Sequence, residues 1–150
     1  LQHGFGWMRQ QTPEHLLAIK AAFEKLPVAI QIEAPSGKPE DRIGLVHADV
    51  PAGMSWPTFV RELEAGTHKV TQIAQWSRKR VDDRDDTGVA GIARVFIGHT
   101  PQVGVTQLGN CYFVDTGGVF RFANSPRSIL YFLMLAETTA PDDALRNPLR

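Results

Sequence analysis

Features that define several protein classes are scarce or absent in this 150-residue sequence. It contains one cysteine, Cys111, so no intrachain disulfide can form, and a reducing, cytoplasmic location is favoured. No apolar run reaches the roughly 18 residues that a membrane-spanning helix requires. We therefore expect neither a disulfide framework nor a membrane partner.

An excess of charge of either sign is also missing. Lys and Arg number 16, Asp and Glu number 16, and the formal net charge is +0. A neutral chain lacks the broad positive field on which non-specific nucleic-acid binding depends, so we expect no nucleic-acid partner. Any site for an anion must instead be built locally, from a few arginines or a metal ion.

The sequence does contain enough apolar residues for a folded core. Hydrophobic residues make up 43% and charged residues 21%, which argues against global disorder. The apolar periodicity predicts an α/β protein whose mixed sheet finishes in an antiparallel portion. The expected helices are 13–25, one after Ser55, and 69–77, and the expected strands are 28–33, 42–47, 93–97, 103–108, 111–115, 119–123 and 128–135. We assign residues 1–136 to one domain and residues 137–150 to a loose polar tail.

Local signals mark two helix starts and one turn. Thr12 can act as an N-cap with Pro13 at the first helical position, and Ser55 can cap the second helix. The dipeptide Gly109-Asn110 between two expected strands predicts a hairpin turn.

Two histidines occupy matching positions in the expected sheet. His47 and His99 each follow a buried strand and precede a tight turn. Strand ends are where α/β sheets place their chemistry, and a neutral imidazole is a good ligand for borderline metals. Either histidine alone is more typical of a half-buried, hydrogen-bonded side chain. Together they indicate a shared metal ion, although catalytic metals usually take at least three protein ligands.

Four short segments resemble, in order and spacing, the C-terminal motifs of the phosphoprotein phosphatases, a family of metal-dependent phosphoesterases. LVHAD at 45–49 is similar to the family's histidine motif, in the variant of the bacteriophage lambda phosphatase and its bacterial relatives. WSRKR at 76–80 resembles the tryptophan-x-arginine-x-arginine segment of that subgroup. FIGHTP at 96–101 and NCYFVDTG at 110–117 match the last two blocks. The close match covers residues 43–120.

The resemblance implies a fold and an activity. The fold would be the α/β/β/α sandwich of the metallophosphoesterases, of which this chain would supply the C-terminal half, with a mixed sheet and antiparallel hairpins. The activity would be hydrolysis of phosphate monoesters, above all phosphoserine or phosphothreonine in proteins. Two divalent metal ions would be the cofactors, with manganese expected and iron or zinc as alternatives.

The resemblance also implies roles for particular residues. By motif position, His47 and His99 would ligate the same one of the two metal ions. Arg78 would bind the phosphate oxygens, because a guanidinium offers a planar fork of donors, and Arg80 is the fallback for that role. The alternative for both arginines is a solvated helix end next to acidic residues.

Two aspartates and the tryptophans complete the candidates. Asp49 and Asp115 would each orient a ligand histidine through a hydrogen bond. Asp115 could equally be a turn former before the glycines that follow it. Trp7, Trp56 and Trp76 are more typical of a core or a pocket wall than of a cofactor platform.

Three N-terminal motifs of the family do not occur in the sequence. They are a glycine-aspartate-x-histidine-glycine motif, a glycine-aspartate-x-x-aspartate-arginine-glycine motif and a glycine-asparagine-histidine motif. In the family they supply the bridging aspartate, the ligands of the other metal and the general-acid histidine, so we assign no catalytic residue here. We expect a truncated chain that provides ligands for one ion and, by itself, hydrolyses substrate near the background rate.

Two alternatives to a protein phosphatase stay open. Related bacterial enzymes that share these motifs hydrolyse dinucleoside tetraphosphates. The chain could also be a non-catalytic binding domain that kept the fold and lost the metal centre. A truncated sandwich would expose apolar sheet surface that its missing half should cover, so we also expect self-association through that surface.

Overall fold

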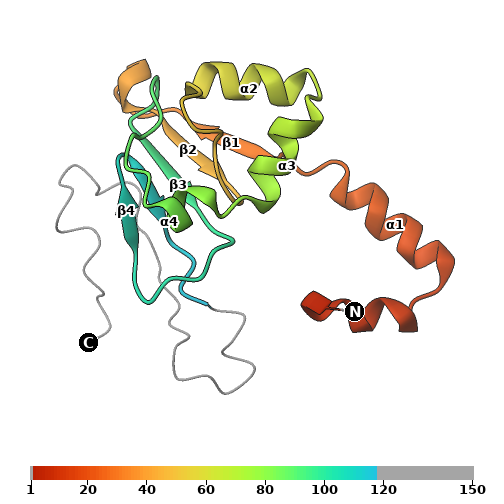
Figure 1. The fold of residues 1–150 in the computed structure, drawn as a ribbon. Helices are drawn as coiled ribbons and strands as arrows, with labels where there is room; N and C mark the ends of the chain where they lie inside the picture. Colours follow the sequence, from red (N-terminus) through yellow and green to blue (C-terminus); the bar gives the residue numbers. More distant parts are fainter. Residues whose placement is uncertain (1, 118–150) are drawn as a thin grey trace.

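The computed structural model of the protein describes residues 2–117, which form a five-stranded sheet with helices against one face (Figure 1). The strand order is β1-β2-β3-β5-β4. The strands are β1 (Ala29–Ile32), β2 (Ile43–Val46), β3 (Arg94–Ile97), β4 (Thr106–Leu108) and β5 (Cys111–Phe113).

The sheet is mixed. Strands β2, β3 and β5 run parallel in the centre, while β1 and β4 pair antiparallel at the two edges. Leu108 faces Cys111 across the turn at Gly109-Asn110, so the predicted hairpin is confirmed. The α/β class and the mixed sheet are confirmed as well. Within residues 2–117 the strands form this one sheet, so the two-sheet sandwich stays a prediction.

Two of the four described helices, those that begin at Pro13 and Trp56, start where the capping signals predict. The four are α1 (Pro13–Phe23), α2 (Trp56–Glu64), α3 (His68–Trp76) and α4 (Lys79–Asp83), with 3-10 helices at Gln2–Gln10 and Pro39–Asp41. The Thr12 hydroxyl accepts a hydrogen bond from the backbone N–H of His15 at 3.3 Å. The Ser55 hydroxyl accepts one from Thr58 at 3.4 Å, so both predicted caps are confirmed.

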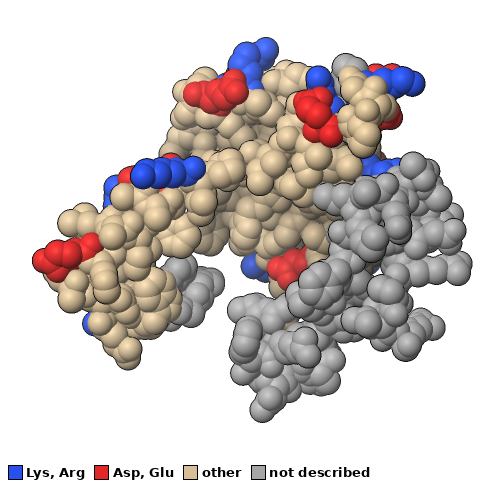
Figure 2. All heavy atoms as spheres, turned by 180° about the vertical axis from the view of Figure 1, so that it is seen from behind, with Lys and Arg blue, Asp and Glu red and all other residues tan. Residues whose placement is uncertain are grey.

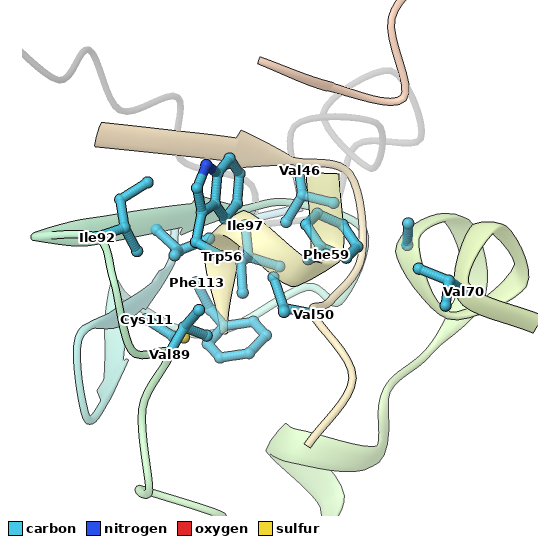
Figure 3. Close-up of a cluster of buried hydrophobic side chains, with 12 residues drawn as sticks. Val46, Val50, Trp56, Phe59, Val70, Val89, Ile92, Ile97, Cys111 and Phe113 are labelled. Carbon is cyan, nitrogen blue, oxygen red and sulfur yellow. The ribbon is translucent and has the colours of Figure 1, made fainter. Parts of the chain in front are cut away.

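Helices α2 and α3 bury their apolar sides against alternate residues of the central strands (Figure 3). Trp56 is 1% exposed and packs against Gly44, where an added Cβ would come within 2.5 Å of the indole ring. The indole N–H donates to Gln31 Oε1 at 2.8 Å, and the Phe59 ring packs beside it at 5.4 Å between centroids. Burial of each such aromatic side chain contributes roughly 1.5–3 kcal/mol, which holds the helix layer on the sheet.

The opposite face of the sheet is apolar too. Phe96 and Tyr112 are buried and stack with ring centroids 5.4 Å apart. Nearer the β1 edge, Ile30 is 47% exposed and lines a groove with Leu45. Figure 2, viewed from the side opposite to Figure 1, shows most of the charged side chains toward the margins of the molecule.

Helix α1 stands away from the sheet (Figure 1). None of its residues is buried, and Leu17 and Phe23 are 67% and 63% exposed. The helix is therefore where the sequence predicts it, but its apolar side chains lie largely at the surface.

Some sequence predictions fall outside residues 2–117. These are the strands at 119–123 and 128–135, the domain boundary at 136 and the tail at 137–150. None of the described helices has both the length and the apolar character that a membrane span demands.

Candidate metal centre

His47 and His99 lie at one edge of the sheet, because they follow the neighbouring parallel strands β2 and β3, in which Val46 faces Ile97. The two rings meet there. His47 Nε2 lies 3.0 Å from His99 Nδ1, and the ring centroids are 4.8 Å apart at an angle of 61°. The structure thus brings together the two histidines that the sequence singles out, joined by a hydrogen bond.

A tight turn sets the backbone conformation at His99. The N–H of Thr100 donates to the carbonyl of Gly98 at 2.7 Å and closes a three-residue turn with His99 at its centre. His99 has a φ of 62°, and this left-handed region costs a non-glycine residue about 1–2 kcal/mol. Gly98 also donates to the carbonyl of His47 at 3.0 Å, so the backbones of the two histidines are linked directly. Backbone strain of this kind gathers at functional sites.

The surroundings favour the neutral form of the His99 imidazole. Burial lowers the pKa of His99, and the nearby His47 and Arg78 side chains lower it further. A hydrogen bond to the backbone of Trp76 and the negative charge of Asp115 raise the pKa of His99, but by less than the other effects lower it. A neutral imidazole keeps a lone pair, which is what a metal ligand needs.

An exposed tryptophan and an exposed arginine stand beside the histidine pair. Trp76, the last residue of α3, is 58% exposed, and its ring lies perpendicular to His99 with centroids 5.9 Å apart. Arg78 is exposed and close enough for its charge to act on His99. Of the core and the pocket wall predicted for Trp76, its exposure excludes the core, and the ring lies at the rim of the candidate site. Its position two residues before Arg78 is the signal that points there.

Arg80 lies in a different environment from Arg78. Its side chain is 2% exposed, and Nε donates to Asp49 Oδ1 at 2.8 Å. Nη2 donates to the carbonyl of Val50 at 3.1 Å, and Nη1 lies 3.6 Å from the Asp85 carboxylate. The guanidinium is therefore bonded inside the protein, unlike that of Arg78, and the fallback role of Arg80 in phosphate binding stays a prediction. Phosphate binding by Arg78 stays a prediction.

Asp49 and Arg80 form a buried ion pair. Burial raises the pKa of Asp49 above its ordinary value, because its effect exceeds the opposing effect of Arg80. Burial lowers the pKa of Arg80, but the nearby Asp49 outweighs this effect, so the pKa of Arg80 is raised as well. A guanidinium keeps its proton in proteins, so Arg80 is positively charged and favours an ionised Asp49, with the Asp85 carboxylate 3.6 Å from Nη1 as a second counter-charge. Asp49 Oδ1 also accepts from the N–H of Val50 at 2.8 Å. These contacts differ from the predicted bond between Asp49 and a histidine.

Asp115 makes the contacts of a turn former. Its Oδ1 accepts from the N–H of Gly117 at 2.8 Å, and its carbonyl accepts from the N–H of Gln102 at 2.7 Å. Of the two interpretations that the sequence left open, the turn is the one these bonds match. A bond from Asp115 to a ligand histidine stays a prediction.

The imidazole pair fits a metal ion in part. Two nitrogens each about 2.1 Å from one ion would lie about 3.0 Å apart at the right angle of octahedral coordination and about 3.4 Å apart at the tetrahedral angle of zinc. The observed separation of 3.0 Å, which is that of the hydrogen bond between the rings, is close to the octahedral spacing. Within residues 2–117, no group of three or more His, Cys, Asp and Glu side chains lies close enough to hold a metal. The described residues thus offer two ligands that manganese, iron and zinc accept, and need partners to complete a site.

The chain shows similarity to a known phosphatase, while no protein-family profile matches it. It is 28% identical over 123 residues to serine/threonine-protein phosphatase 1 of Salmonella typhimurium. The alignment covers 80% of this chain and 51% of that protein, so the chain spans about half the length of the curated relative it matches. The similarity supports a relationship to the phosphoprotein phosphatases, which are hydrolases.

Proposed function

We propose that this chain forms part of a metal-dependent phosphate monoester hydrolase, a serine/threonine protein phosphatase of the lambda-phosphatase-like type. The observation that carries the proposal is the convergence of the His47 and His99 rings, 3.0 Å apart, beside the exposed Arg78. The similarity to a phosphatase over 123 residues supports it independently.

The residues of the site have distinct roles in this proposal. His47 and His99 hold one of two divalent ions, manganese by preference, with iron or zinc as alternatives. The bound ions would supply an acidified water and positive charge near the phosphoryl oxygens. Arg78 binds two of those oxygens through its planar fork of N–H donors and so holds the phosphate in one orientation.

The site of the described residues is incomplete, and this limits the expected activity. Two histidines bind a divalent ion more weakly than the three or more protein ligands of catalytic centres. A general acid for the leaving oxygen is also unassigned. We therefore expect the 150-residue chain to bind transition metals weakly and to hydrolyse phosphate esters near the background rate.

Metal binding by the histidine pair can be measured directly. Titration with Ni²⁺ or Zn²⁺ in a calorimeter should show one saturable site that is lost in His47→Ala and in His99→Ala. His68→Ala is the matched control, because His68 is an exposed histidine on α3. Equal loss in the control, or no saturable binding by the wild type, would contradict the proposed site.

Hydrolysis is best tested in a chimera. The segment of the Salmonella phosphatase that aligns with this chain is replaced by the matching residues of this chain. We expect Mn²⁺-dependent hydrolysis of a phosphoserine peptide, and a loss of about 100-fold in kcat/KM for Arg78→Ala, in line with the loss of a donor to transition-state charge. Arg84→Ala is the control, since it removes another exposed arginine, the residue that directly follows α4. A folded chimera that binds Mn²⁺ without hydrolysis would refute the enzyme assignment.

A dinucleoside tetraphosphatase is a second candidate, favoured by the exposed indole of Trp76 next to His99. An exposed aromatic ring can stack on a nucleobase, and such stacking is worth about 1–3 kcal/mol. In the chimera, Trp76→Ala should then lower kcat/KM for diadenosine tetraphosphate at least about fivefold more than for the phosphoserine peptide. Equal effects on both substrates would favour the protein phosphatase.

A non-catalytic binding domain is the third candidate. The observation in its favour is that residues 2–117 gather no third metal-ligating side chain at the histidine pair. It predicts that the chimera binds a phosphopeptide and releases it unchanged, with or without Mn²⁺.

A further inference from the structure

The buried contacts of Arg80 are an unusual way to hold a loop. The guanidinium is 2% exposed and bonds both the Asp49 carboxylate and the carbonyl of Val50, at 2.8 Å and 3.1 Å. It therefore forms hydrogen bonds to two consecutive residues of the segment that follows His47. Arg80 itself belongs to α4 and lies two residues after the exposed Arg78.

Stability alone is a weak reason for such a pair. Taking two charges out of water costs several kcal/mol per ion, and buried ion pairs can often be replaced by apolar side chains without loss of stability. The Nη1 nitrogen of Arg80 is buried without a hydrogen bond, although the Asp85 carboxylate lies 3.6 Å away, and this adds to the cost. The pair is therefore better explained by the segment that it holds in place than by its effect on stability.

The segment after β2 is fixed from three sides. The carbonyl of His47 accepts from Gly98 beside β3 at 3.0 Å, and the N–H of Ala48 donates to Ala74 of α3 at 2.8 Å. Arg80 of α4 then holds the next two residues. Since the first two contacts are single backbone bonds, the Arg80 side chain supplies the charged link that sets the segment against α4.

We propose that the Arg80–Asp49 pair is a positioning device that holds the His47 ring against His99 and sets both at a fixed distance from Arg78. The inference rests on the proposed function, in which His47 ligates a metal and Arg78 binds phosphate. Arg80 and Asp49 contact neither the metal nor the phosphate in this proposal, and they act through the backbone segments that they join.

Four variants separate positioning from stability. Asp49→Ala and Arg80→Met remove the link. Asp49→Asn keeps an oxygen that can accept from Arg80 and Val50, and so removes the charge while preserving the bonds. Ile92→Ala is the matched control for lost stability, because Ile92 is a buried core residue just before β3, at the opposite end of that strand from His99.

Three measurements are made on each variant. Urea unfolding gives the stability. Nuclear Overhauser contacts between the His47 and His99 ring protons report the ring geometry without any metal. Quenching of Trp76 fluorescence by Ni²⁺ reports metal affinity, because the indole lies 5.9 Å from the His99 ring, and Trp76→Phe gives the blank.

The link predicts a distinct pattern. Asp49→Ala and Arg80→Met should lose the ring contacts and bind Ni²⁺ about 10–100-fold more weakly, the usual effect of removing support from a metal ligand. Asp49→Asn should keep the ring contacts and most of the affinity although it is less stable, and Ile92→Ala should keep both.

Other patterns overturn the inference. It fails when Asp49→Ala keeps the ring contacts, when Ile92→Ala loses them to the same degree at equal stability, or when the wild type shows none. A wild type that shows ring contacts but no Ni²⁺ binding refutes the proposed function, and the ring contacts of the variants then decide the positioning role by themselves.

Discussion

His99 occupies the centre of a three-residue turn with a φ of 62°. An alanine at this position keeps the left-handed strain, whereas a glycine relieves it. We expect His99→Gly to be about 1 kcal/mol more stable than His99→Ala, after allowance for the greater freedom of glycine in the unfolded chain. Urea unfolding of the two variants measures this, and the comparison cancels the loss of the ring because both lack it. Equal stabilities would show that the turn relaxes.

The buried thiol of Cys111 gives a pH-dependent prediction. Burial raises the pKa of Cys111 to about 11, and the residue is 0% exposed. Between pH 9 and pH 11 the unfolded chain loses the thiol proton while the folded chain keeps it, so stability falls as pH rises through this window. The expected loss is about 2–3 kcal/mol, at about 1.4 kcal/mol per pKa unit.

Other groups also titrate between pH 9 and pH 11, and their effect on stability is removed by comparison with a matched variant. Cys111→Ala lacks the thiol, so the difference in urea stability between wild type and variant should shrink from pH 8 to pH 11. A difference that stays constant over this range would show that the thiol titrates alike in both states.

The candidate site shows which residues sequence reasoning can reach. His47 and His99 were predictable as a pair because both follow parallel strands, whose carboxyl ends share one edge. Arg78 and Arg80 were not separable, since they lie two residues apart in one motif. Burial of one and exposure of the other depend on how α4 packs against the segment after β2, and that is set by tertiary contacts.

At the scale of elements, the contact between α2 and β2 depends on a glycine, Gly44, which has no side chain. Gly44 packs against the Trp56 ring, and a Cβ there would approach it to 2.5 Å. Gly44→Ala should therefore destabilise the protein by about 1–3 kcal/mol, as overpacking does in rigid cores. Gly104→Ala is the control, because no atom lies within 4 Å of its added Cβ.

A double-mutant cycle identifies the cause. In a Trp56→Leu background the clash is removed, so Gly44→Ala should cost less than it does in the wild type. A cost that is the same in both backgrounds would place the strain in the β2 backbone and not in the helix contact.

Elements with local signals were predicted well and the others poorly. Thr12 and Ser55 cap their helices through side-chain bonds that involve neighbours in sequence, and Gly109-Asn110 turns the hairpin. Helix α4 (Lys79–Asp83) was not predicted, because five residues are too few for an apolar period to appear. Its position depends on the bond from Arg80 to Asp49, a residue 31 positions away.

At the scale of the whole molecule, composition indicated a core but not which surfaces it leaves uncovered. The period of α1 predicts an amphipathic helix, yet none of its residues is buried. Apolar periodicity records that a face suits burial and carries no information about the partner that buries it. The second face of the sheet illustrates the same limit, because Phe96 is buried there while Ile30 is 47% exposed.

Self-association through the second sheet face is the prediction for the whole chain. Ile30 lies on edge strand β1 and lines the apolar groove with Leu45, and exposed apolar surface of this kind drives association. We expect the wild type to form dimers or larger species as its concentration rises in light scattering. Ile30→Asp should shift the population toward monomer, since a carboxylate in the groove would lose water on association. Val103→Asp makes the same change at a side chain that is 93% exposed in a loop, and should leave association unaltered. A wild type that stays monomeric at all concentrations would contradict the prediction, and equal effects of both variants would assign the change to net charge.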